Sequence, residues 1–179
     1  DILTFQILSS VPSGVIAELM IYITDEDNYD HITNIDLIIG EALPLAIYSF
    51  EETDDGWIVG DLGDDATAGI WELAIPVATF YNDNQAQPGY DHSEDGEKCF
   101  LTGAATNPGS VGFDDVDGGK TTLLSPVFDL SGYNEALVSY WRWYTNNVGD
   151  NPGTDHWMVD VTSDGGQNWN ALEYANESQ

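Results

Sequence analysis

Apolar and polar residues alternate with a period of two along much of this chain, which predicts β-strands. The clearest case is residues 136–144, ALVSYWRWY. Successive side chains of a strand point to opposite faces. One face of this segment therefore carries Leu137, Ser139, Trp141 and Trp143. The other carries Val138, Tyr140, Arg142 and Tyr144. Because both faces are bulky, we expect a central strand of a two-sheet sandwich.

The same pattern predicts further strands, joined by turns, on both sides of this segment. In the N-terminal part they cover residues 3–8, 15–24 and 32–39. Later ones cover residues 48–51, 57–59, 69–72, 98–102, 121–124, 157–162 and 167–172. The run NDNQAQP at 82–88 is expected to be a polar loop. Since no segment has the 3.6-residue period of a helix, the sequence predicts an all-β protein with long acidic loops.

Arg142 is the only arginine and lies among the aromatic residues of 136–144. A guanidinium pairs with carboxylates and stacks on aromatic rings. We therefore expect Arg142 to pair with a carboxylate such as that of Asp114 or Asp160, or to stack on Tyr140 or Tyr144.

Charge is the strongest constraint that composition adds. The chain has 32 acidic residues and 3 basic ones, a net charge of −29. Such a chain repels nucleic acids and anionic membranes, so binding to a phosphate backbone is excluded. Hydrophobic residues make up 42% of the chain, enough for a folded core, and no apolar run is long enough to span a bilayer. The single cysteine, Cys99, excludes an intrachain disulfide.

Two modules are expected. Residues 1–42 contain three predicted strands, which are few for an independent domain. This part resembles the terminal strands of an immunoglobulin-like or fibronectin-like β-sandwich. Residues 43–46, which include Pro44, are expected to be a linker. Residues 47–179 form the second module.

The second module carries short motifs in a characteristic order. They are Phe50-Glu51 with Gly56-Trp57, Gly69-Ile70-Trp71-Glu72, Tyr90-Asp91-His92 with Cys99-Phe100-Leu101-Thr102, Leu124-Ser125-Pro126 with Phe128-Asp129-Leu130-Ser131-Gly132-Tyr133, Ser139-Tyr140-Trp141-Arg142-Trp143, and Asp164-Gly165-Gly166 with Trp169. Together they resemble the MAM-like jelly-roll modules of extracellular proteins. The resemblance is greatest to the versions attached to secreted bacterial metallopeptidases, of the zinc-carboxypeptidase and immune-inhibitor-A-like kinds.

The resemblance implies a two-sheet antiparallel jelly-roll sandwich that is secreted, has no catalytic residues of its own and is stabilised by calcium. Its partners would be neighbouring domains of the same polypeptide and a glycan or protein substrate. Animal relatives carry disulfides, which this chain cannot form. The jelly roll should also continue past Asp164-Gly165-Gly166. We therefore expect it to be truncated at its C-terminus or completed by a strand from elsewhere, since an open edge invites pairing.

Acidic loops supply candidate calcium ligands. Calcium takes six to eight oxygen ligands, and carboxylates in loops provide them readily. The candidates lie at a strand end and in two turns: Glu51, Glu52, Asp54, Asp91, Asp114 and Asp117. The resemblance matches Glu51 and Asp91 best. The alternative is that these acids bond to the local backbone or face water.

Other chemistries find less support. The histidines are scattered, without the spacing of a zinc site, and no GxSxG motif is present. The main alternative to an accessory module of a secreted hydrolase is carbohydrate binding, with Trp57, Trp141 and Trp143 as stacking platforms. Large aromatic residues on strands also commonly form the core. A third possibility is a structural surface or filament protein that assembles by strand exchange.

Overall fold

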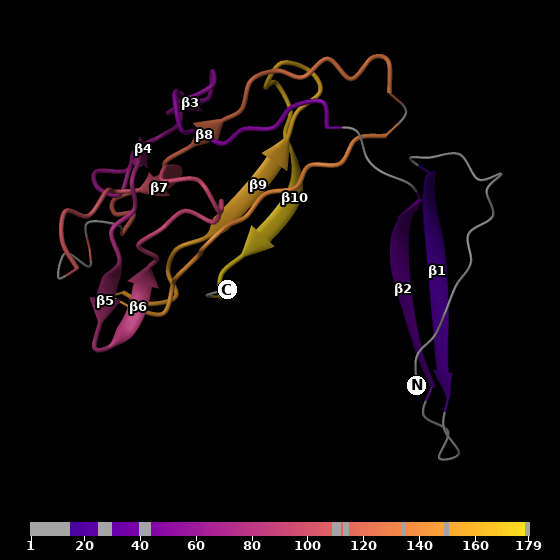
Figure 1. Cartoon of the computed structure of the whole chain (residues 1–179), viewed down its shortest axis with the longest axis horizontal. Helices are drawn as coiled ribbons and strands as arrows, with labels where there is room; N and C mark the ends of the chain where they lie inside the picture. The colour runs from indigo at the N-terminus through magenta and orange to yellow at the C-terminus, as the bar shows by residue number, and fades with distance from the viewer. Residues whose placement is uncertain are drawn as a thin grey trace. The chain divides into compact units, whose positions relative to one another are not determined.

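A computed structural model describes residues 15–24, 30–39, 44–108, 112, 115–133, 135–148 and 151–177. Throughout these ranges the protein is all-β, without a helix, and its strands pair in small antiparallel sheets (Figure 1). The search of the same ranges for a helix that could cross a membrane found none. The chain divides into two compact units, Asp1–Ile47 and Tyr48–Gln179. Their boundary lies beside the expected linker at 43–46.

The first unit contains one long hairpin. Strand β1 (Val15–Thr24) pairs with β2 (Asp30–Ile39) along its whole length, from Val15 opposite Ile39 to Thr24 opposite Asp30. Aliphatic and β-branched residues dominate both strands, which suits a pleated surface. The strands predicted at 15–24 and 32–39 are confirmed. The strand predicted at 3–8 lies outside the described residues.

Four short pairings build the second unit, and two of them join segments that are distant in sequence. In these two, β3 (Ile58–Val59) pairs with β8 (Leu123–Leu124), and β4 (Trp71–Ala74) pairs with β7 (Cys99–Thr102). β5 (Thr79–Tyr81) pairs with β6 (Asn84–Gln87), and β9 (Trp157–Val161) with β10 (Asn170–Ala175). Six of these eight strands overlap predicted ones, and β10 begins and ends three residues later than predicted.

The hairpin of β5 and β6 corrects the prediction of a polar loop at 82–88. Its turn residues, Asn82 and Asp83, both have positive φ, of 48° and 67°. Asn and Asp tolerate this conformation, and two such residues form the tight turn that suits a hairpin. The polar side chain of Gln87 is buried, and its amide donates a hydrogen bond to the carbonyl of Val77 at 3.1 Å, which offsets the loss of water.

Two predicted strands are wrong. Residues 48–51 cannot continue as a strand because Phe50 has a φ of 61°, in the left-handed region. Residues 136–144 have no ladder partner among the described residues. Side chains hold this second segment instead, and they alternate as expected. Tyr140 and Tyr144 lie against Trp157, whereas Trp141 stacks on His92.

Arg142 pairs with a carboxylate that the sequence analysis did not name. Its guanidinium lies 2.6 Å from the carboxylate of Glu173 on β10, and over the ring of Trp157 at 5.5 Å. Asp160 is therefore not its ion-pair partner, and Asp114 lies outside the described residues. Glu173 also accepts hydrogen bonds from the Tyr140 hydroxyl and, at 3.4 Å, from the indole N–H of Trp157. This group ties residues 140–142 to β9 and β10.

An aromatic cluster packs around Phe50 in the second unit. Phe50 lies edge-on to Phe100 at 5.0 Å and to Trp57 at 5.6 Å, and its ring stacks with Tyr48 at 6.0 Å. Phe128 contacts Tyr48 at 6.2 Å. Such pairs add about 0.5–1.5 kcal/mol each beyond the area they bury. The cluster therefore joins three separate chain segments, around residues 48–57, β7 and 128.

Replacing Phe100 by alanine should destabilise the second unit by about 2–3 kcal/mol, because the ring that contacts both Phe50 and Trp57 is lost. Urea unfolding followed by tryptophan fluorescence measures this change. The control is Val127→Ala, whose side chain is 97% exposed and should change stability by less than about 0.5 kcal/mol. Equal effects of the two substitutions would show that the cluster has no stabilising role.

Candidate functional site

Glu51 follows Phe50 of the aromatic cluster, and its side chain lies beside the residues that precede β7. Its carboxylate accepts the backbone N–H of Glu97 at 3.0 Å and that of Lys98 at 3.2 Å. The Lys98 ammonium donates to the backbone carbonyl of Glu51 at 2.7 Å. These bonds fix the direction of the Glu51 side chain, since both carboxylate oxygens are engaged.

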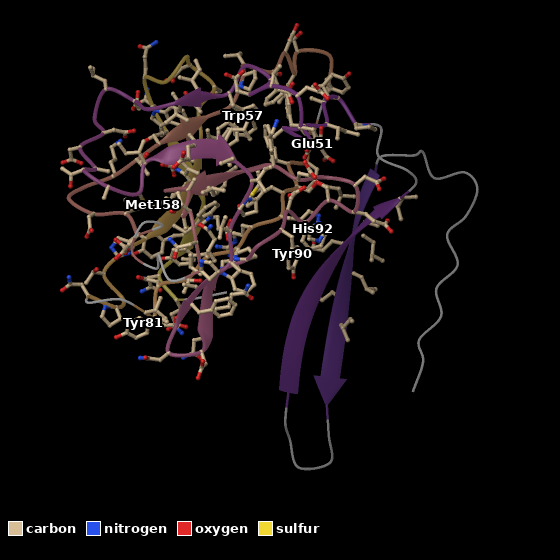
Figure 2. All side chains as sticks on the ribbon, turned by 60° about the vertical axis from the view of Figure 1, so that its left-hand side comes forward. Glu51, Trp57, Tyr81, Tyr90, His92 and Met158 are labelled. Carbon is tan, nitrogen blue, oxygen red and sulfur yellow. The ribbon has the colours of Figure 1, made fainter. Side chains whose placement is uncertain are left out.

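Asp91 approaches the same point from the preceding turn. Its carboxylate accepts the backbone N–H of His92 at 2.6 Å and that of Ser93 at 3.1 Å. A Cβ added at Gly96 would lie 2.3 Å from Asp91 Oδ2 and 2.9 Å from Glu51 Oε1. The two carboxylates therefore converge beside Gly96, where the absence of a side chain leaves them room. Figure 2 shows Glu51 and His92 near each other in this region.

The two carboxylates place negative charge at this point. Burial, with the charges of Asp91 and Glu51 adding to it, raises the pKa of the Cys99 thiol to about 11. Within the part of the chain that the structure describes, neither carboxylate forms an ion pair. Two converging carboxylates are hard oxygen donors of the kind that Ca²⁺ prefers. The remaining positions around such an ion would come from backbone carbonyls and water.

The other predicted metal ligands are not brought to this point. Glu52 is exposed, and Asp54 accepts the N–H of Gly56 at 3.0 Å within its own turn. Asp117 forms a backbone bridge with Ala68, and Asp114 lies outside the described residues. Among the residues searched, no group of three or more His, Cys, Asp and Glu side chains is arranged to hold a metal ion. Of the predicted ligands in the described residues, only Glu51 and Asp91 are brought together.

The three predicted stacking residues have different surroundings. Trp57 belongs to the aromatic cluster. Trp141 is 77% exposed and stacks on His92, with 3.7 Å between ring centroids and 10° between planes. Trp143 is 49% exposed, and its indole N–H donates to the carbonyl of Ala86 at 2.8 Å. Trp141 and Trp143 therefore remain available to a ligand, whereas Trp57 serves packing.

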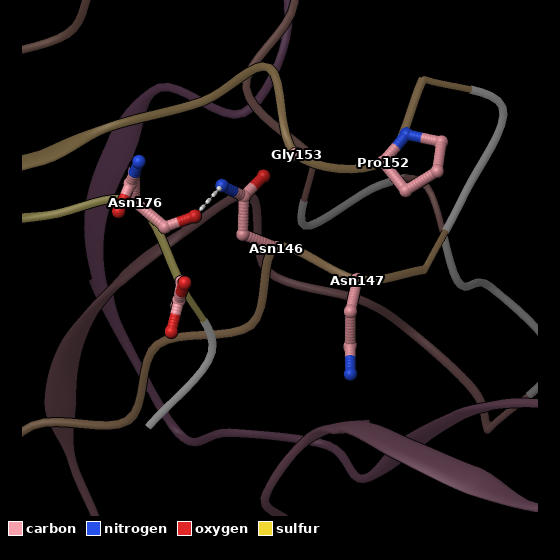
Figure 3. A pocket seen from close by; sticks show the side chains of 6 residues that line it. Asn146, Asn147, Pro152, Gly153 and Asn176 are labelled. Carbon is pink, nitrogen blue, oxygen red and sulfur yellow. Dashed lines mark hydrogen bonds between the residues drawn. The ribbon is translucent and has the colours of Figure 1, made fainter.

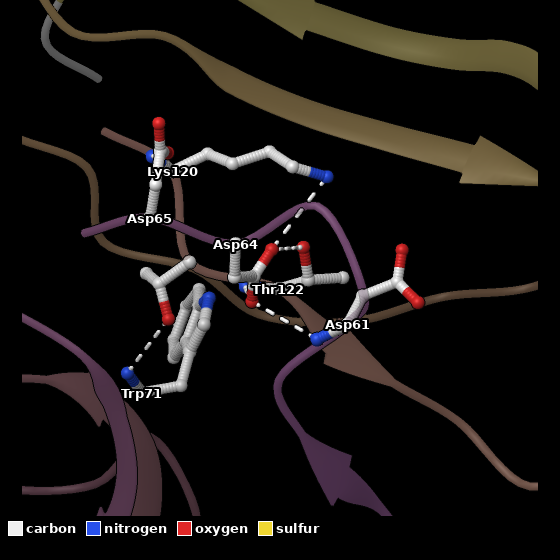
Figure 4. A network of polar contacts seen from close by, with 7 residues as sticks. Asp61, Asp64, Asp65, Trp71, Lys120 and Thr122 are labelled. Carbon is white, nitrogen blue, oxygen red and sulfur yellow. Dashed lines mark hydrogen bonds and ion pairs between the residues drawn. The ribbon is translucent and has the colours of Figure 1, made fainter.

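Asp64 is a well-connected carboxylate that the sequence analysis did not single out. It accepts the Thr122 hydroxyl at 2.6 Å, the Thr122 N–H at 2.8 Å and the Asp61 N–H at 3.1 Å (Figure 4). The Lys120 ammonium lies 3.5 Å away. Burial raises the pKa of Asp64, but the bonds from Thr122 and Asp61 and the charge of Lys120 outweigh it, so the pKa is lowered. This network is structural, because the contacts with Thr122 and Lys120 join the 61–65 loop to residues 120–122 and the bond from Asp61 closes the loop itself.

Comparisons with protein families, with curated proteins and with solved structures found no match to this chain.

The lowered pKa of Asp64 makes its contribution to stability depend on pH. The folded-state pKa lies below the unfolded value of about 3.9, so the stabilisation is fully present above about pH 4 and is lost as pH falls through the folded value. Asp64→Asn should therefore lower stability at pH 7 and flatten the acid limb of the stability curve. Urea unfolding between pH 2 and 7 measures this, in steps of roughly half a pH unit.

The matched control is Asp160→Asn, which removes one carboxylate from an exposed position on β9. It should leave the acid limb unchanged. An unaltered limb in Asp64→Asn would show that the bonds around Asp64 do not stabilise its charged form.

Proposed function

We propose that the chain is a non-catalytic, calcium-stabilised accessory module of a secreted hydrolase. The observation that carries this proposal is the convergence of Glu51 and Asp91 beside Gly96. The two residues are far apart in sequence and reach one point with no ion pair to either carboxylate in the described part of the chain. An ion held there would join the segment before Trp57 to the turn before β7.

Calcium suits this arrangement better than zinc or magnesium. The donors are carboxylate oxygens, whereas zinc prefers Cys and His ligands. Magnesium demands a near-ideal octahedron, whereas calcium accepts the irregular geometry that a turn offers. The ligands proposed are Glu51 and Asp91.

The jelly-roll sandwich and its relation to MAM-like modules belong to the same proposal. Support comes from the motif residues that carry the resemblance. Phe50 and Trp57 come from one motif and Phe100 from another, and the three pack in one cluster next to Glu51. Motif residues that serve packing are expected to lie together in the folded protein in this way. In this proposal the module spaces or presents a neighbouring enzyme domain, a metallopeptidase in the relatives that it resembles.

A thermal melt with calcium and with a chelator tests the site. A ligand bound only by the folded state stabilises it by mass action, by about 2.7 kcal/mol at a concentration of 100 times Kd. We expect calcium to raise Tm in a saturable manner, and magnesium at the same ionic strength to have little effect. Equal ionic strength matters because any salt screens the repulsion within a chain of net charge −29.

Glu51→Gln and Asp91→Asn should each abolish the calcium-dependent rise in Tm. Glu52→Gln and Asp54→Asn are the matched controls, since each removes one carboxylate from the same acidic loop and should leave the rise intact. Loss of the rise in all four variants would mean that calcium acts by general screening. A rise that survives in Glu51→Gln would contradict the proposed ligands.

A further inference from the structure

Two hollows meet on the surface of the second unit, and both are lined by Asn147. The first has a volume of about 430 Å³ and is also lined by Asn176 and Glu177 (Figure 3). The second has a volume of about 480 Å³ and is also lined by Asn84, Gln85 and Trp143. Each volume lies in the range of small-molecule sites. Because they share a wall residue, together they can take an elongated ligand.

Trp143 offers the second hollow a half-exposed ring in a fixed orientation. Its indole N–H donates to the carbonyl of Ala86 and to the hydroxyl of Thr145, both at 2.8 Å. The Thr145 hydroxyl in turn donates to the same carbonyl at 2.6 Å. The polar edge of the indole is thus satisfied by the protein, and its apolar surface remains for a ligand. Binding would therefore cost little conformational entropy for this side chain.

Carboxamides provide most of the polar lining. Four of these side chains form no hydrogen bond within the described residues: Asn84, Gln85, Asn147 and Asn176. Asn146 is only 5% exposed, and its amide donates to the carbonyls of Asp155 and Asn176 at 2.9 and 2.8 Å. These bonds fix the wall of the first hollow, so its surface is pre-formed. The two hollows together are called the groove below. Its wall is held in place by the bonds of Asn146, and carboxamide side chains line it.

We propose that this groove binds a neutral oligosaccharide. A pyranose ring has an apolar C–H face that packs on an indole, and hydroxyls that donate and accept. Carboxamides also donate and accept, so they match hydroxyls on both counts. No Lys or Arg lines either hollow, and the chain is strongly acidic, which disfavours anionic sugars. A proline-rich peptide would fit the indole, but proline residues provide only acceptors and would leave the carboxamide oxygens unpaired.

This inference does not rest on the calcium proposal, because neither Glu51 nor Asp91 lines the groove. It is tested by isothermal titration calorimetry of the full chain against cellohexaose, xylohexaose and mannohexaose, with hexagalacturonate as the anionic control. At least one neutral hexasaccharide should bind, and hexagalacturonate should not. Trp143→Ala should weaken binding at least tenfold, and Asn147→Ala about threefold to tenfold.

Trp141→Ala is the matched control, since it removes a more exposed indole from the same segment but outside the groove. It should leave affinity unchanged. Asn84→Ala provides a second test of the groove in case Trp143→Ala fails to fold, because it changes the groove at an exposed side chain. The proposal is overturned if no neutral hexasaccharide binds at millimolar concentration, if only a proline-rich peptide binds, or if Trp141→Ala abolishes binding while Trp143→Ala and Asn84→Ala do not.

Discussion

The organisation of the second unit depends on the carboxylate of Glu173. It receives the Arg142 guanidinium, the Tyr140 hydroxyl and the Trp157 indole N–H. The hydrogen bond from Tyr140, together with the charge of Arg142, lowers the pKa of Glu173, so the group stays ionised. Through it, a segment without a strand partner among the described residues is held against β9 and β10. Side-chain contacts hold this segment in place, whereas backbone hydrogen bonds hold the paired strands of the sheets.

The three basic residues of this acidic chain each connect separate segments. Lys98 reaches the carbonyl of Glu51, Lys120 lies beside Asp64, and Arg142 pairs with Glu173. Several carboxylates accept hydrogen bonds from backbone N–H groups, as Asp164 does at the turn between β9 and β10. That arrangement stabilises ionised acids without cations. It explains how a chain with a net charge of −29 can have ordered turns.

The sequence was a good guide where side-chain preference and backbone pairing agree. β1, β7 and β9 could be predicted because they are rich in apolar, β-branched and aromatic residues. β6 could not, because NQAQ is polar and its pairing depends on the positive φ of Asn82 and Asp83. The feature of the sequence that could have predicted this hairpin is the Asn-Asp pair between Tyr81 and Asn84. Glu51 and Asp91 could be suggested from the sequence, but their convergence depends on the tertiary approach of two segments at Gly96.

The environment of Cys99 has a consequence for the chemical durability of the protein. A thiol with a pKa of about 11 is a thiolate in roughly one molecule in ten thousand at pH 7. Because the thiolate is the species that attacks disulfides and peroxides, this side chain reacts slowly with both. Burial, with the two carboxylates that could attract a cation adding to it, therefore protects the single sulfhydryl from oxidation and from cross-linking to another chain.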